Sequence, residues 1–105
     1  MRTREATATV KRGAKLLDKA FPDWEAKIDL DFLNMFSYNQ CILGQLYGEY
    51  ETGMCVLFPG MSGDLDLYEN NSNRYGFEAD LHANRARALT QLEVAWENLI
   101  LGRAT

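Results

Sequence analysis

Residues 37–57 of the chain read Ser-Tyr-Asn-Gln-Cys-Ile-Leu-Gly-Gln-Leu-Tyr-Gly-Glu-Tyr-Glu-Thr-Gly-Met-Cys-Val-Leu. Ser37 and Gln40 stand at the S-x-x-Q spacing of a capping box, which predicts a helix start near Tyr38. Apolar side chains then recur at helical spacing along two adjacent rows, one formed by Ile42, Leu46 and Tyr50 and the other by Leu43, Tyr47 and Met54. This broad apolar surface predicts a central, largely buried helix from residue 38 to residue 57.

Two glycines in this helix, Gly44 and Gly48, stand four residues apart. Each costs about 1 kcal/mol against alanine in helix propensity, so their presence predicts that a neighbouring backbone packs closely against them. The G-x-x-x-G pattern also occurs in membrane helices, but Gln45, Glu49 and Glu51 interrupt the apolar run well before about 20 residues. We therefore expect helix packing at the glycines and no membrane span.

Gly53 leaves two alternatives for the end of the helix. It could be the left-handed residue that ends the helix, leaving residues 54–58 as a short strand, or an interior glycine with the helix continuing to Leu57. A single five-residue strand would find no partner strand in the rest of the chain, so we favour continuation. Phe58-Pro59-Gly60 ends the helix in both cases.

The composition is that of an ordinary globular protein. The chain has 105 residues, of which 47% are hydrophobic and 25% are charged, a length that predicts a single helical domain over residues 1–105. The formal charge of −4 is unevenly spread, because residues 1–20 carry six basic and two acidic side chains whereas residues 21–80 carry two basic and eleven acidic ones. One interpretation is a surface divided into a positive part and a negative part. The other is that the charged side chains lie on solvated helix faces and pair only loosely with one another.

Amphipathic patterns predict further helices on both sides of the central one. Residues 3–20 form a basic helix whose apolar face carries Ala6, Val10, Ala14 and Leu17 and which ends at Phe21-Pro22. A short helix starting at Pro22 should turn Trp24 and Ile28 inward. A last helix should run from Asp80, its candidate N-cap, to Gly102, with the apolar stripe Leu81, Leu89, Leu92, Trp96 and Leu99.

The segment of residues 59–76 is rich in glycine and asparagine, which predicts a long polar loop. The predicted fold class is accordingly all-α: a small single-domain bundle of three longer helices plus one or two short helical turns, with this loop near 59–76.

Two Asp-x-Asp pairs, Asp29/Asp31 and Asp64/Asp66, are the nearest approach to a metal motif. After Asp64 and Asp66, an EF-hand would need an oxygen ligand, a glycine and an acid where the chain has Tyr68, Glu69 and Tyr75. Capping and turn formation explain the aspartates better. We expect no metal site.

His82 is the single histidine, and no catalytic or nucleotide-binding motif accompanies it. Cys41 and Cys55 both fall in apolar helical context and are expected to be buried thiols. A disulfide between them would require the central helix to break, because fourteen residues of helix span about 21 Å. Convergence of His82 with a cysteine in space stays open, but we predict no enzymatic activity and no cofactor.

Two kinds of partner fit the remaining features. Aromatic residues of the type enriched at protein interfaces are Tyr47, Tyr50, Phe58, Tyr68 and Tyr75, although core packing explains most of them equally well. Basic residues that could follow a nucleic-acid backbone from the first helix are Arg4, Lys11, Arg12, Lys15 and Lys19. A homodimer is compatible with both interpretations.

Three blocks of sequence support a resemblance. They are Lys11-Arg12-Gly13-Ala14-Lys15-Leu16-Leu17-Asp18, then Pro22-x-Trp24 with Ile28-Asp29-Leu30-Asp31, and then Cys41-Ile42-Leu43-Gly44-Gln45-Leu46-Tyr47-Gly48. In order and spacing the chain resembles a group of small uncharacterised proteins of actinobacteriophages and actinobacterial genomes, over residues 10–57 with a looser echo at 75–77 and 92–103. Members often carry a second cysteine where this chain has Tyr38, so a role of such a cysteine pair does not carry over.

The resemblance implies a phage accessory protein in a bacterial host cytoplasm. The Met-Arg-Thr-Arg start lacks an apolar signal segment, which agrees with a cytoplasmic location. The sequence-based hypothesis is a protein that binds and modulates a host macromolecule, such as an inhibitor of a host enzyme or defence system. The alternative is a nucleic-acid-binding protein that uses the basic N-terminal helix.

Overall fold

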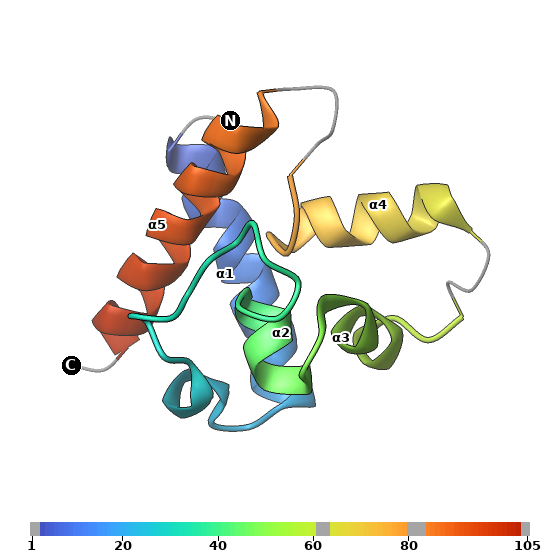
Figure 1. Cartoon of the computed structure of the whole chain (residues 1–105), viewed down its shortest axis with the longest axis horizontal. Coiled ribbons are helices and arrows are strands. Elements are labelled where there is room, and N and C mark those ends of the chain that lie inside the picture. Colours follow the sequence, from blue (N-terminus) through green and yellow to red (C-terminus); the bar gives the residue numbers. More distant parts are fainter. Residues whose placement is uncertain (1–2, 61–63, 80–83, 104–105) are drawn as a thin grey trace.

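Two long helices from opposite ends of the chain, α1 (Thr3–Ala20) and α5 (Arg85–Arg103), pack side by side in a computed structural model that describes residues 3–60, 64–79 and 84–103 (Figure 1). They run in the same direction, since Gly13 of α1 lies against Trp96 of α5 and Asp18 lies against Arg103. The apolar face predicted for the first helix is buried, as Ala6, Val10, Ala14 and Leu17 are each fully shielded from solvent. This helix is confirmed.

Both tryptophans lie in the core between these helices. Trp24 of the 3-10 helix η1 (Trp24–Lys27) meets Trp96 edge to face, with ring centroids 5.7 Å apart, and Phe77 stacks on Trp96 at 5.9 Å. Each buried indole N–H has an acceptor: Trp24 donates to the Asp18 carboxylate at 2.9 Å and Trp96 donates to the Gly76 carbonyl at 2.8 Å. The inward tryptophan is thus confirmed, but the helix begins at Trp24 rather than at Pro22, because Asp23 has a left-handed backbone with φ of +63°.

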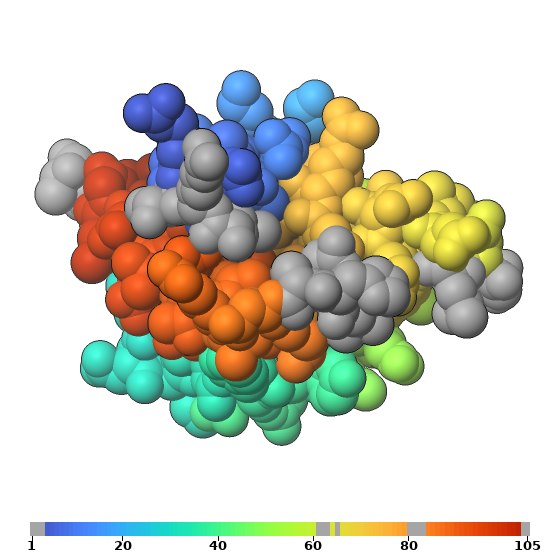
Figure 2. Space-filling model, turned by 90° about the horizontal axis from the view of Figure 1, so that it is seen from above, coloured from blue at the N-terminus to red at the C-terminus, as the bar shows by residue number. Residues whose placement is uncertain are grey.

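The segment between η1 and the middle of the chain covers the other side of α5. Figure 2 shows α5 between α1 and this segment, whose colours run from blue-green to green. The Met35 amide donates to the Glu93 carboxylate of α5 at 2.8 Å, and the Gln45 side chain bonds both the amide and the carbonyl of Asp29. These side-chain bonds hold a stretch that has little regular structure of its own.

The predicted continuous central helix is wrong, because the chain forms two short helices, α2 (Ile42–Tyr47) and α3 (Tyr50–Leu57). Gly48 ends α2 with φ of +88°, a conformation that glycine adopts without steric cost. Ser37 is not the N-cap. Its hydroxyl donates to Asn39 at 2.7 Å, while the Cys41 sulfur accepts the Gly44 amide at 3.3 Å and caps α2.

The glycines of this region pack differently from the prediction. A Cβ on Gly44 would lie 2.5 Å from the Tyr38 carbonyl oxygen, so Gly44 packs against its own preceding turn rather than against a neighbouring helix. A Cβ on Gly48 would meet nothing within 4 Å. Gly53 is an interior glycine against Leu43, which confirms the favoured continuation of helix to Leu57.

The predicted loop at 59–76 is also wrong, because it contains the helix α4 (Leu65–Arg74). The Asp64 carboxylate caps this helix by accepting the Leu67 amide at 2.9 Å, in agreement with the capping role expected for that aspartate. Ser72 is buried on its inner face, and its carbonyl accepts the amides of Phe77 and Glu78 to end the helix. Burial of one face therefore outweighs the low helix propensity of an asparagine-rich segment.

The last helix is confirmed from Arg85 to Arg103, although it begins after Asn84 rather than after Asp80 and continues through Gly102, which was predicted to end it. Asn84 precedes α5, and its side chain accepts the Arg87 amide at 3.3 Å. The predicted N-cap Asp80 lies outside the described residues, as do Leu81 and His82. The described ranges contain helices and no β-strand, so the predicted all-α bundle is confirmed. Within the same ranges, the helices are all too short or too polar to cross a membrane.

Candidate functional site

A cavity of about 410 Å³ opens where α3, α4 and the start of α5 meet. Its aromatic lining comes from Tyr38, Tyr50 and Tyr68, and its charged lining comes from Glu51, Glu69, Glu78 and Arg85. Cavities of this size are typical of sites that hold a small molecule or one side chain of a partner. We call this cavity the tyrosine pocket.

The break between α2 and α3 positions two of the three tyrosines. The Tyr50 amide, at the start of α3, donates to the Tyr38 carbonyl at 2.7 Å. The two rings consequently lie 5.8 Å apart, and the Tyr68 ring of α4 meets the Tyr50 ring edge to face at 6.0 Å. Tyr50 therefore lies between a tyrosine of a turn and a tyrosine of another helix.

The three tyrosines differ in exposure. Tyr38 is 63% exposed and Tyr50 is 5% exposed, while Tyr68 is half-buried. The Tyr50 hydroxyl is buried, and the hydroxyls of Ser72 and Tyr68 lie close enough to interact with it, although neither forms a hydrogen bond of good geometry. Burial raises the pKa of Tyr50 far above its ordinary value, so the phenol is neutral at physiological pH.

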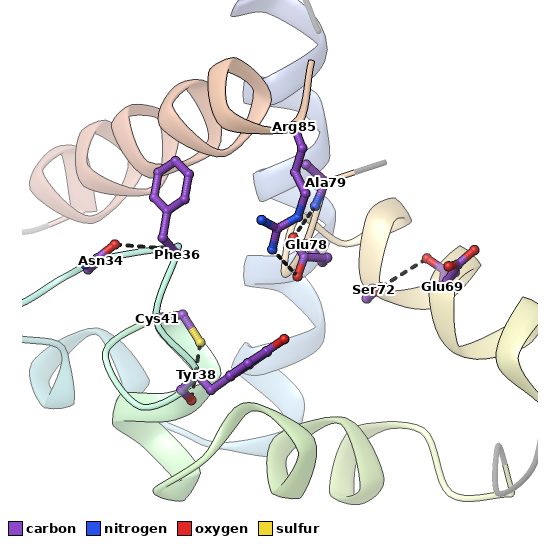
Figure 3. A network of polar contacts seen from close by, with 9 residues as sticks. All are labelled: Asn34, Phe36, Tyr38, Cys41, Glu69, Ser72, Glu78, Ala79 and Arg85. Carbon is purple, nitrogen blue, oxygen red and sulfur yellow. Dashed lines mark hydrogen bonds and ion pairs between the residues drawn. The ribbon is translucent and has the colours of Figure 1, made fainter. Parts of the chain in front are cut away.

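The wall opposite Tyr38 is formed by the turn that follows α4. Glu78 accepts the Ala79 amide at 2.9 Å and the Arg85 guanidinium at 3.1 Å, and Figure 3 shows the Tyr38 ring extending toward this ion pair. The Arg85 Nε is buried and has no partner among the residues described. The ion pair joins the start of α5 to the end of α4.

The pocket carries an excess of negative charge. Glu78 is neutralised by Arg85, whereas Glu51 and Glu69 are exposed and form no ion pair with any described residue. Because these two carboxylates line the same cavity as the tyrosine rings, they create a negative potential beside an apolar surface. The arrangement suits a positively charged group.

The five aromatic residues predicted to bind a partner lie in three places. Tyr50 and Tyr68 come together in the tyrosine pocket. Phe58 packs against Tyr75 at 5.4 Å, and Tyr47 packs edge to face on Phe21 at 5.5 Å, in both cases partly buried against the core. Tyr50 itself is a buried core residue that also lines the pocket.

Sequence reasoning does not single out Tyr38, Glu51, Glu69, Glu78 or Arg85 as residues of this pocket. Tyr38 stands at a predicted helix start, and the acidic residues belong to the general negative charge of residues 21–80. A sequence signal for their convergence is lacking, because it depends on the turn at Gly48 and on α4.

The five predicted basic residues, Arg4, Lys11, Arg12, Lys15 and Lys19, are all exposed. At 3.6 residues per turn they fall within an arc of about 100° on α1, which we call the basic stripe. Arg12 uses part of its guanidinium to donate to the Arg74 carbonyl at 3.0 Å and to the Thr9 hydroxyl at 3.2 Å. Lys11 and Lys15 also line a second cavity, of about 490 Å³, between α1 and α5.

The other predicted features take structural roles. Cys41 is buried, as expected, but Cys55 is exposed, which corrects its predicted burial. Asp29 accepts the Asp31 amide at 3.0 Å, which is the turn formation expected of that pair. The described part of the chain shows no group of three or more His, Cys, Asp or Glu side chains that could hold a metal ion.

Comparison with known proteins finds no matching family model, no similar curated protein and no similar solved structure. The site is therefore interpreted from its own geometry.

Proposed function

We propose that the chain is a binding protein that modulates a host macromolecule, as a phage accessory protein in a bacterial cytoplasm, and that the tyrosine pocket is where it contacts a partner protein. It acts by occupying a surface of that partner rather than by catalysis. The proposal extends the resemblance described above, and its support in the geometry is the tyrosine pocket.

One observation carries this proposal: an open cavity of about 410 Å³ is lined by three tyrosines, of which Tyr38 is 63% exposed. Tyr38, which is mostly exposed at the rim, offers an aromatic surface of the kind that dominates binding energies at interfaces.

Photocrosslinking tests the proposal in a bacterial host. A benzophenone amino acid replaces Tyr38 in one protein and Val56, which is 55% exposed and outside the pocket lining, in the control protein. We expect a discrete crosslinked protein from position 38 that is absent from position 56. Equal or absent crosslinking at both positions would contradict the proposal.

Nucleic-acid binding is the second candidate, because the basic stripe keeps its five cations exposed on one face of α1. Contacts to phosphates release counterions, so affinity should fall steeply between about 50 and 200 mM salt. Replacing Lys11 and Lys15 by Glu should abolish binding, whereas Lys27→Glu, on η1, should not. Failure of the wild-type protein to retard DNA or RNA at low salt would eliminate this candidate.

A further inference from the structure

We propose that the tyrosine pocket binds an organic cation, a guanidinium or alkylammonium group, between the tyrosine rings and the carboxylates of Glu51 and Glu69. The proposal deepens the proposed function and rests on it in one respect only: when the cation belongs to a protein, it is an arginine or lysine side chain of the partner.

The sign of the ligand's charge follows from the charges of the lining. Glu78 and Arg85 neutralise each other, which leaves the two exposed carboxylates Glu51 and Glu69 at the rim. An anion entering here would face two like charges with only a paired arginine to receive it. A cation gains attraction from both carboxylates and displaces only water.

The tyrosine rings supply the second attraction. Aromatic faces attract a cation within about 6 Å of the ring centroid. The rings of Tyr38 and Tyr68 lie 5.8 and 6.0 Å from the Tyr50 ring, so the lining presents a cluster of aromatic rings rather than a single one. The described part of the chain already contains this interaction, since the Arg74 guanidinium lies 5.9 Å from the Tyr75 centroid and that of Arg103 lies 5.8 Å from the Trp24 centroid.

The carboxylates of Glu51 and Glu69 provide directionality. Each carboxylate oxygen can accept an N–H of a guanidinium or primary ammonium group. Because a quaternary ammonium has no N–H, a guanidinium or primary ammonium should bind better than a quaternary one.

The pocket wall itself shows that a guanidinium is tolerated there. The Arg85 head group lies against Glu78, half-exposed, with one N–H bonded to that carboxylate. The cavity volume of about 410 Å³ leaves room for a second cationic head group with its alkyl stem.

Binding is tested with three probes followed by NMR of the tyrosine ring signals. Ethylguanidinium is the cation, ethylurea is its neutral isostere, and tetramethylammonium is a cation without N–H groups. We expect ethylguanidinium to bind at least about tenfold more tightly than ethylurea, with tetramethylammonium between them. Equal affinity of ethylguanidinium and ethylurea, or no ring shifts with any probe, would overturn the proposal.

Variants locate the site. Tyr38→Leu should weaken ethylguanidinium binding by about two- to fivefold, as expected for loss of a cation–π contact at an exposed position, and Tyr38→Phe should retain it. Glu51→Gln should weaken the cation but not ethylurea. Phe36→Leu is the matched control, because Phe36 is 48% exposed and does not line the tyrosine pocket. An unchanged affinity in Tyr38→Leu, with its fold verified by a melting curve, would overturn the placement.

A short peptide with one central arginine distinguishes the sources of the cation. Tighter binding of the peptide than of ethylguanidinium assigns the site to a protein side chain, and weaker binding assigns it to a free small molecule. Crosslinking at position 38 without cation binding would remove this inference and leave the proposed function intact. Cation binding without crosslinking would contradict the proposed function and leave this inference intact.

Discussion

Gly13→Ala should strongly destabilise the protein, although it replaces a poor helix former inside α1. A Cβ at this position would collide with the Tyr75 backbone carbonyl oxygen and would lie 2.9 Å from the Trp96 ring. Neither neighbour moves easily, because the carbonyl is backbone and the indole is held by the Trp24 edge contact and by its bond to Gly76.

The magnitude follows from two opposed effects. Alanine gains about 1 kcal/mol of helix propensity over glycine. Overpacking costs about 1–3 kcal/mol, and the two short contacts against rigid groups place this site at the upper end. The net loss is then about 2 kcal/mol, which corresponds to a fall in Tm of about 8–16 °C for a domain of this size.

Thermal melts followed by circular dichroism measure the effect, with Gly102→Ala as the matched control. Gly102 is also a helical glycine, but a Cβ there would meet nothing within 4 Å, so its replacement should leave Tm unchanged or raise it. If Gly13→Ala melts at or above the wild type, the close packing of α1 against the Tyr75 carbonyl and against Trp96 of α5 would be refuted.

Three further predictions concern titrating and reactive groups. Because burial raises the pKa of Tyr50, the unfolded state loses the phenol proton first, so stability falls as pH rises above 10. Tyr50→Phe removes this titration and should therefore unfold at a higher pH in alkaline titrations. The hydrogen-bonded Arg103 guanidinium lowers the pKa of Asp18 below 3.8. The stability that the ion pair contributes is therefore complete above that pH and is lost as pH falls through the lowered pKa. Asp18→Asn should flatten this part of the acid unfolding curve by less than about 1 kcal/mol, since the pair is exposed to solvent. In the native protein, a thiol reagent should modify the exposed Cys55 rapidly. Cys41 should react only on unfolding, because it is buried and burial raises the pKa of its thiol. Equal rates of modification at the two cysteines would contradict the burial assigned to Cys41.

The ends of the chain were predictable from sequence because their signals are local. The first helix shows an uninterrupted apolar row and a proline stop, and the last helix shows a long stripe around Trp96. Both patterns arise from the 3.6-residue period and need no knowledge of the neighbours. The structure confirms both helices over the residues it describes.

The middle of the chain was not predictable to the same degree. Gly48 has the sequence context of an interior glycine, and only its φ of +88° shows that it ends α2. Residues 65–74 have the composition of a loop, and they form a helix because Ser72 and Tyr68 pack inward and Asp64 caps the first turn. The tyrosine pocket depends on both features, so its residues could be named as aromatic or acidic but not brought together.

The pairing of α1 with α5 has a consequence for synthesis on the ribosome. About 60 residues separate the end of α1 from the start of α5, and α5 covers much of the apolar face of α1. At 5–20 residues per second, the first helix waits about 3–13 s before its partner is translated. During that interval the part of the apolar face of α1 that α5 later covers is available to a chaperone that binds the nascent chain. The small residues of the same face, Ala6, Gly13 and Ala14, limit the hydrophobic area that is exposed while the chain waits.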